Sequence, residues 1–188
     1  MVLPIVKYGH PVLRKKGDRI TEITPAVSKL IEDMLETMYD AEGVGLAAQQ
    51  VAQALQLTVI DVREVKERPS SLEINGQPAD VASIMPLVLI NPDIKGVGNS
   101  VAGPEGCLSF PEIYEDVTRP EFVEVSAQDA KGRPIQFKAG GLLARAIQHE
   151  TDHLNGILFI DRMPGKAKQA LKPELEALHA ETKAALKK

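Results

Sequence analysis

Apolar residues recur at three- and four-residue intervals between Thr24 and Glu42, which is the pattern of an amphipathic helix. Thr24 suits the N-cap and Pro25 the first helical position, and Gly43 is placed to end the helix. The pattern therefore predicts one long helix with a core-facing stripe formed by Val27, Leu30, Ile31, Met34, Leu35 and Met38.

Short runs of β-branched and apolar residues predict the strands. The segment Arg63–Ser83 is polar and contains two prolines and a glycine, so we interpret it as a long surface loop or hairpin, inserted into the core architecture. The dipeptide Lys131-Gly132 supplies a hairpin turn between the last two strands. We expect strands at residues 58–62, 87–91, 122–127 and 135–137.

A second helix is predicted from Gly140-Gly141 to Leu154, with Gly156 as its terminator. Its apolar side consists of Leu142, Leu143, Ala146 and Ile147.

The composition changes after Asp161, where Pro164-Gly165 breaks the chain and a stretch rich in Lys, Glu and Ala follows. A thin leucine edge predicts a peripheral C-terminal helix that is interrupted at Pro173. We therefore divide the chain into a domain of residues 1–163 and a polar helical tail of residues 164–188.

The amino-acid composition and net charge limit the classes of protein to which this chain can belong. The 188 residues are 44% hydrophobic and 26% charged, with a net charge of −4, which favours a globular protein over a basic nucleic-acid binder. A single cysteine excludes an intrachain disulfide and fits a reducing compartment. Neither a membrane-length apolar run nor a signal-peptide pattern is present. We expect a cytoplasmic protein that binds neither nucleic acid nor membrane directly.

Candidate metal chemistry lies in the second predicted helix, at residues 149–153, with the sequence His-Glu-Thr-Asp-His. Four-residue spacing places His149 and His153 on one helix face, where both imidazoles can bind one metal ion. Glu150 is close enough to reach a water molecule on that ion, which is the general-base arrangement of the H-E-x-x-H motif. The alternative is an ordinary pair of surface or core histidines.

A third protein ligand is needed to complete such a site. The extended metalloprotease pattern would have a third histidine where this chain has Phe159, and the downstream glutamates lie in the polar tail. Cys107, in a tight turn with Gly106, supplies the missing donor. Two other uses of this thiol remain open, namely a small buried side chain and a Cys–His nucleophile.

A third feature is the glycine-rich segment Gly43–Gln50, with the sequence Gly-Val-Gly-Leu-Ala-Ala-Gln-Gln. It follows a helix and has neither a third glycine nor a following lysine, so it is not a dinucleotide or phosphate loop. Alternating glycines allow close approach of the backbone to a ligand, although for this segment taken alone a purely structural turn is the favoured explanation.

The three segments together resemble the peptide deformylase family, which carries G-x-G-x-A-A-x-Q, E-G-C-x-S and H-E-x-x-H in this order. Here they stand at Gly43–Gln50, Glu105–Ser109 and His149–His153. Similarity extends from Met1 to about Asp161. Two features depart from the family: Thr151 replaces a usually apolar residue, and Arg63–Ser83 is longer than in compact members.

The resemblance implies an α+β fold in which antiparallel strands pack around a central helix carrying the H-E-x-x-H motif, with a peripheral C-terminal helix. It implies removal of the formyl group from the N-terminal formylmethionine of nascent polypeptides, with release of formate. The alternative is an H-E-x-x-H metallopeptidase. As in some members, the tail is a candidate for ribosome docking, and a solvated helix is the competing interpretation.

The resemblance also implies roles for residues. Cys107, His149 and His153 would hold one divalent metal ion, natively Fe2+, with Zn2+, Ni2+ or Co2+ in purified protein. Glu150 would act as the base for a metal-activated water. The side-chain amide of Gln50 and the backbone N–H of Leu108 would stabilise the oxyanion, so Gln50→Ala should lower turnover roughly 100- to 1000-fold. Gly45 would hydrogen-bond the substrate backbone.

Overall fold

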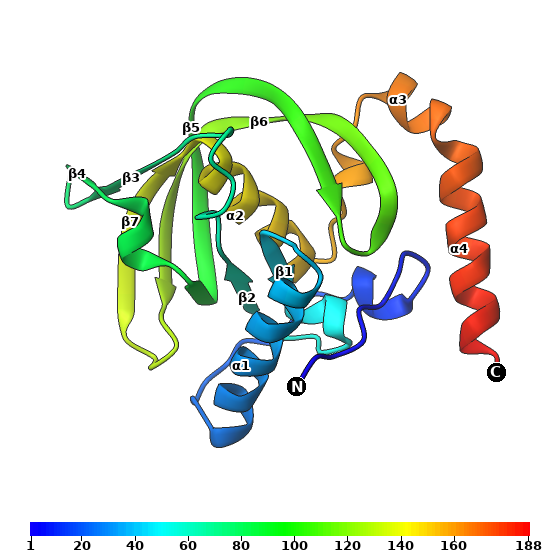
Figure 1. Ribbon diagram of the computed structural model, residues 1–188, viewed down its shortest axis with the longest axis horizontal. Helices are drawn as coiled ribbons and strands as arrows, with labels where there is room; N and C mark the ends of the chain where they lie inside the picture. The colour runs from blue at the N-terminus through cyan, green and yellow to red at the C-terminus, as the bar shows by residue number, and fades with distance from the viewer.

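Seven antiparallel strands form one sheet in the computed structural model, which describes residues 1–188 (Figure 1). The order across the sheet is β1-β2-β5-β6-β7-β3-β4. This mixture of helices with an antiparallel sheet is the α+β class expected from the sequence. The strands are β1 (Gly45–Ala47), β2 (Leu57–Ile60), β3 (Ser70–Ile74), β4 (Gln77–Ala79), β5 (Leu87–Cys107), β6 (Phe110–Gln128) and β7 (Pro134–Gly140).

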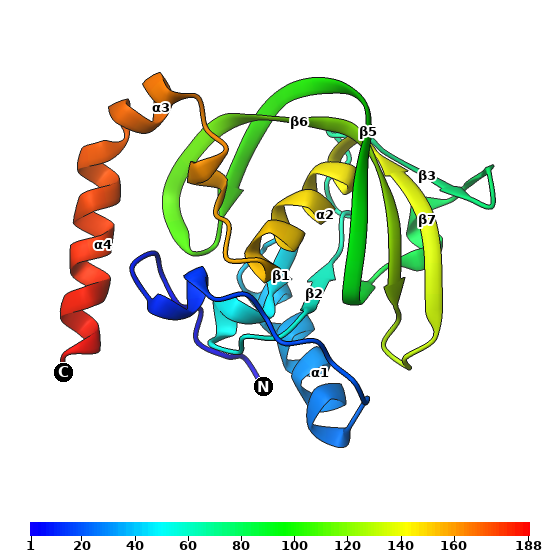
Figure 2. The same cartoon turned by 180° about the vertical axis from the view of Figure 1, so that it is seen from behind.

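β5 and β6 are much longer than the sequence pattern predicted. They pair from Ile90↔Gln128 to Cys107↔Phe110, with three register irregularities on the way, and they arch over the molecule (Figure 2). The outer part of β5 is mostly exposed, and the outer part of β6 alternates buried and exposed residues, so neither has the continuous apolar run by which a buried strand is recognised. The predicted strands at 87–91 and 122–127 are only parts of these two elements.

The segment Arg63–Ser83 is partly a hairpin and not only a loop. β3 and β4 pair around the turn Asn75-Gly76, where both residues have positive φ. β3 also pairs with β7, so the hairpin extends the sheet, and Leu72 is 3% exposed in the core. The hairpin interpretation is confirmed for residues 70–79, and residues 63–69 before it form an irregular connection.

Helix α1 (Pro25–Asp40) begins as predicted, with the Thr24 hydroxyl accepting a hydrogen bond from the N–H of Val27. Its apolar stripe packs on β1 and β2 in a cluster of 11 buried residues. The residue that turns the chain away is Glu42, with φ 55°, and not Gly43, so the prediction for the C-terminus was one residue late.

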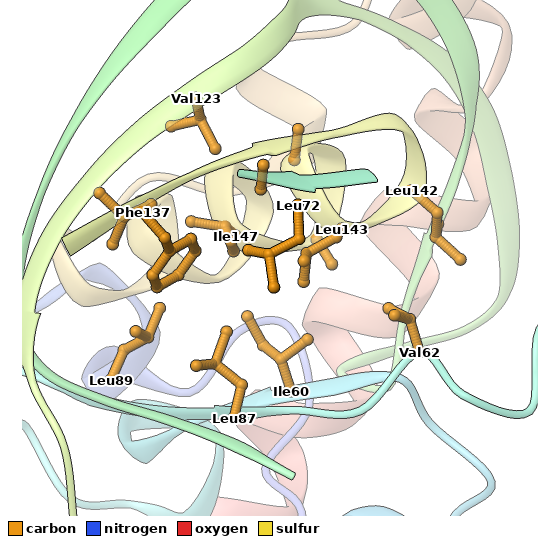
Figure 3. Close-up of a cluster of buried hydrophobic side chains, with 14 of the residues drawn as sticks. Ile60, Val62, Leu72, Leu87, Leu89, Val123, Phe137, Leu142, Leu143 and Ile147 are labelled. Carbon is orange, nitrogen blue, oxygen red and sulfur yellow. The ribbon is translucent and has the colours of Figure 1, made fainter. Parts of the chain in front are cut away.

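Helix α2 (Gly141–Leu154) has the predicted bounds and is enclosed by the curved sheet (Figures 1 and 2). Leu143 and Ile147 are fully buried. They face Leu72, Phe137 and the buried side chains of the paired strands β2 and β5 (Figure 3). The predicted apolar side is confirmed as part of a 16-residue cluster. Gly156, with φ 75°, follows the helix end.

The C-terminal residues form two helices, α3 (Gly165–Ala170) and α4 (Lys172–Leu186), on one side of the molecule (Figure 1). The interruption is at Leu171 and not at Pro173, because Pro173 lies in the first turn of α4, where no backbone donor is needed. α4 is held by Leu175, which joins a cluster with Leu13 and Phe110. Four 3-10 turns complete the fold at Pro11–Arg14, Ala48–Val51, Val81–Ile84 and Phe159–Asp161. None of the helices combines the length and the apolar character needed to cross a bilayer.

Candidate active site

The three predicted ligands come together at the end of β5 and on α2. Cys107 is the last residue of β5, just before the two-residue turn to β6, and His149 and His153 lie one turn apart on α2. Their donor atoms all lie within 4.8 Å of one another, and Cys107 Sγ is 3.3 Å from His153 Nε2. One sulfur and two imidazole nitrogens suit a divalent transition metal.

Glu105 orients the first histidine. Its Oε1 lies 2.8 Å from His149 Nδ1, which leaves Nε2 of that ring for a ligand. Burial alone would raise the pKa of Glu105, but hydrogen bonds from His149 and Arg119 lower it to about 2. Glu105 is the first residue of the E-G-C-x-S motif, and its contact with His149 was not predicted from the sequence.

Arg119 connects the two parts of the site. Its guanidinium is 5% exposed, donates two hydrogen bonds to Glu105 at 2.6 and 2.9 Å, and donates one to Asp152 at 2.9 Å. Arg162 pairs with the same Asp152 from outside. β5, β6 and α2 are thereby joined through charged groups whose hydrogen bonds are satisfied, a condition that buried ion pairs require.

Glu150 lies at the inner wall of the site and is 5% exposed. Desolvation raises the pKa of its carboxyl group to about 7, and its Oε2 has no hydrogen-bond partner within the protein. A Cβ on Gly45 would lie 2.7 Å from Glu150 Oε1, so β1 can approach this carboxylate only with glycine at that position. A buried, unpartnered carboxylate next to metal-type donors fits a base for a water-dependent reaction.

The two histidines differ in their electrostatics. Burial would lower the pKa of His149, but hydrogen bonds to Cys107 and Glu105 raise it well above its ordinary value. Burial lowers the pKa of His153 well below its ordinary value, and the positive charge on His149 adds to this. A neutral imidazole is the form that binds a metal, so a metal ion would displace a proton from His149, whereas His153 is already neutral. The residues present fit a metal ion held by Cys107, His149 and His153, because their donor atoms lie within 4.8 Å of one another and Glu105 holds Nδ1 of His149.

The two predicted oxyanion donors border the same cavity as Cys107. Gln50 is oriented by its Oε1, which accepts a hydrogen bond from the N–H of Ala47 at 2.9 Å, and its Nε2 lies 3.5 Å from Cys107 Sγ. Its Nε2 also donates to Ser109 Oγ at 3.2 Å. The carbonyl of Leu108 accepts a hydrogen bond from Lys7 Nζ at 3.1 Å, which orients the peptide of the β5–β6 turn.

The cavity has a volume of about 470 Å3 and runs between the segment Glu42–Gly45 and the end of β5. Leu142 and Ala146 of α2 form part of its apolar lining, and Arg68 and Tyr114 also border it. The place of Arg68 in the cavity lining was not predicted from the sequence, because Arg68 belongs to the segment interpreted as an insertion. Phe159, where an extended metalloprotease motif requires histidine, packs against the His149 ring with centroids 5.7 Å apart.

Comparison with known proteins identifies close relatives. A family model described as polypeptide deformylase matches residues 2–169. The peptide deformylase of Methylacidiphilum infernorum is 51% identical over 95% of this chain and 93% of its own length. That of Opitutus terrae is 46% identical over 100% of this chain and 98% of its own.

Solved structures agree with these sequences. A peptide deformylase from Synechococcus elongatus, in complex with actinonin, is 43% identical with a TM-score of 0.77, over 92% of this chain and 85% of that one. A peptide deformylase from Plasmodium falciparum is 32% identical with a TM-score of 0.81, over 96% of this chain and 97% of that one.

Proposed function

The chain belongs to the peptide deformylase family and removes the formyl group from N-formylmethionyl peptides, and from this premise we propose how its residues perform the reaction. We assign Cys107, His149 and His153 as the ligands of one divalent metal ion, and Glu150 as the general base. The observation that carries this assignment is the convergence of one sulfur and two imidazoles, whose donor atoms lie within 4.8 Å of one another, beside a cavity that Cys107, His149 and the buried Glu150 line. The metallopeptidase alternative is not favoured by the relatives.

The metal is proposed to be Fe2+ in the cell, with Zn2+, Ni2+ or Co2+ able to occupy the same donors. When bound, the ion would supply Lewis-acid chemistry and lower the pKa of water towards neutrality. The helix α2, with the H-E-x-x-H motif inside the curved sheet, is proposed as the element that organises the site. It fixes the spacing of both histidines, while Glu105 fixes the ring of His149.

Glu150 moves the proton. A water molecule attacks the formyl carbon, and the Glu150 carboxylate accepts the proton that this water loses. The tetrahedral species then breaks its C–N bond, and Glu150 returns the proton to the departing amine, so that formate and a free N-terminus result. A pKa of about 7 suits a group that must both accept and release a proton near neutral pH.

Gln50 and Leu108 are proposed to bind the oxygen on which negative charge develops. The Ala47 contact leaves the Gln50 amide nitrogen pointing towards Cys107, and Leu108 follows Cys107 directly in the chain. Donors that are fixed before the reaction need no reorganisation when the charge appears.

The substrate backbone is proposed to pair with β1 at Gly45. β1 is the first strand in the sheet order, so only one of its edges is occupied, by β2. An extended peptide can add to the other edge. Leu142 and Ala146 are then proposed to line the slot for the methionine side chain.

The division into a catalytic unit of residues 1–163 and a tail of residues 164–188 remains our proposal. Ribosome docking through the tail would bring the cavity to emerging nascent chains, which also places the protein in the cytoplasm. Leu175 anchors the tail to the catalytic unit, so a docked tail would hold the cavity at a fixed orientation.

The decisive experiment measures formate released from a formyl-Met peptide by metal-loaded protein purified without oxygen. Glu150→Gln keeps the side-chain volume and should reduce kcat by about 100- to 10,000-fold while the metal content is unchanged. Glu181→Gln, on exposed α4, is the matched control and should keep full activity. Cleavage of internal peptide bonds without formate release would overturn the assignment and support the metallopeptidase alternative.

A further inference from the structure

Arg68 occupies a fixed place on the rim of the cavity. Immediately after it, the carbonyl of Pro69 accepts a hydrogen bond from the N–H of Leu142, and the Ser70 hydroxyl accepts one from Leu143, both at 3.0 Å. These bonds satisfy the first donors of α2, which has no side-chain cap of its own. Arg68 is therefore held relative to the helix that carries the catalytic motif.

The guanidinium of Arg68 has donors to spare. Its one hydrogen bond to the protein is from a terminal nitrogen to the carbonyl of Pro104 at 3.0 Å, and it makes no ion pair. Arg145 borders the same cavity but is engaged by Glu105 and by the carbonyls of Val117 and Val101. Of the two arginines in the cavity lining, Arg68 is thus the one able to bind a further acceptor.

The position of Pro104 sets the distance of Arg68 from the reacting group. Pro104 precedes Cys107 by three residues on β5, which is about 10 Å in an extended strand. An extended peptide with its formyl group at Cys107 covers that distance with its first three residues. Side chains one and three of such a peptide point to the same side. If the peptide runs from Cys107 towards Pro104 with its methionine side chain at Leu142, its third side chain would lie on the side of Arg68, which borders the same cavity.

We propose that Arg68 is a specificity-determining residue that binds a substrate carboxylate at the third residue of the formyl peptide. The carboxylate is either an acidic side chain or the free C-terminus of a short peptide. A planar guanidinium with unused donors recognises this group through charge-assisted hydrogen bonds. The inference rests on the proposed function, because it assumes that the formyl group lies at Cys107 and Glu150.

The test compares kcat/KM for formyl-Met-Ala-Glu-amide and formyl-Met-Ala-Gln-amide. The wild-type protein should prefer the Glu peptide by about 3- to 5-fold at low salt, and less at high salt because exposed ion pairs are screened. Arg68→Gln should bring the ratio to about 1. Arg19→Gln is the matched control, because Arg19 also makes no ion pair, is exposed and lies outside the cavity lining.

Formyl-Met-Ala-Ala as the free acid and as the amide forms the second pair and distinguishes the two sources of the carboxylate. Dependence on Arg68 in either pair supports the proposal. Equal rates within both pairs for the wild type, or ratios that survive in Arg68→Gln, overturn it.

Calorimetric titration of the same peptides into Glu150→Gln separates this result from a failure of the proposed function. The Kd ratio in this variant does not depend on turnover. Tighter binding of the carboxylate peptide, lost when Arg68→Gln is added, supports the proposal even if formate is never released. Equal Kd values overturn it even if formate is released.

Discussion

Helices α2 and α4 are similar in length and in residue types but differ in surroundings. α2 has 14 residues and α4 has 15, and each contains leucines, a glutamate-threonine pair and at least one histidine. α2 is buried along nearly all its length, whereas Leu175 is the one buried residue of α4. His149 binds Glu105 inside the protein, while His179 lies half-buried with its ring edge-to-face against Tyr8.

The difference between α2 and α4 shows that the packing around a polar side chain, and not the residue type alone, decides whether that side chain can act in catalysis. Burial raises the pKa of Glu150 in α2 to about 7, which makes it a base suited to neutral pH. In α4 the carboxylate of Glu176 meets Lys172 at 3.7 Å with both side chains 68% exposed. The contrast between α2 and α4 can be tested with pairs of equivalent substitutions, one at or next to α2 and one in α4.

The largest expected effect on stability comes from Glu105, which anchors α2 through His149. Glu105→Gln removes one of the two carboxylate partners of buried Arg119, the one that accepts two of its hydrogen bonds, and should lower the free energy of unfolding by about 3–5 kcal/mol. Glu176→Gln in α4 should change it by less than about 0.5 kcal/mol. Urea unfolding of both variants measures this, and equal losses would remove the contrast between the helices.

The stability of the metal-free protein should depend on pH through the ionisation of the Glu105 carboxyl group. The folded pKa of Glu105 is about 2 and the ordinary value is 4.5, so the unfolded chain binds the proton more tightly. Its contribution, about 3 kcal/mol, is complete above pH 4.5 and is lost as the pH falls towards 2. Urea midpoints between pH 6 and pH 2.5 should show this decline, and Glu105→Gln should flatten it. A wild-type profile as flat as that of the variant would contradict the assignment.

Truncation of a core leucine should give a smaller difference in the free energy of unfolding between the two helices. Leu143→Ala opens a space inside the 16-residue cluster and should cost about 3–4 kcal/mol, since this side chain is 0% exposed. Leu175→Ala, at the edge of its cluster with 6% exposure, should cost about 2 kcal/mol. Thermal or urea unfolding compares them directly. A larger loss for Leu175→Ala would show that the tail is as integral to the core as α2.

The smallest expected effect is a gain. The Thr151 hydroxyl in α2 is buried and has no hydrogen-bond partner, so Thr151→Val should raise the free energy of unfolding by about 1 kcal/mol. Thr182→Val in α4 is the matched change at a half-buried position and should stay within about 0.5 kcal/mol of the wild type. A loss of stability in Thr151→Val would mean that this hydroxyl is satisfied in solution.

Several features that depend only on residues within a single helix were predicted correctly from the sequence. The Thr24 cap, the bounds of α2 and its buried apolar side follow from residues close together in the chain. The lengths of β5 and β6 were not predicted, because their outer parts have no continuous apolar run and are held as strands by pairing with each other. The β3–β4 hairpin was only half recognised, since its place in the sheet depends on pairing with β7.

The sequence by itself determined that His149, Glu150 and His153 share one turn of a helix, because helical spacing is a local property. It also offered Cys107 as the partner donor. Only the tertiary structure decided that Cys107 lies 3.3 Å from His153, that Glu105 orients His149, and that Arg68 reaches the cavity. Those distances depend on strand register and on how α2 lies within the sheet, and both are fixed by packing between residues far apart in the chain.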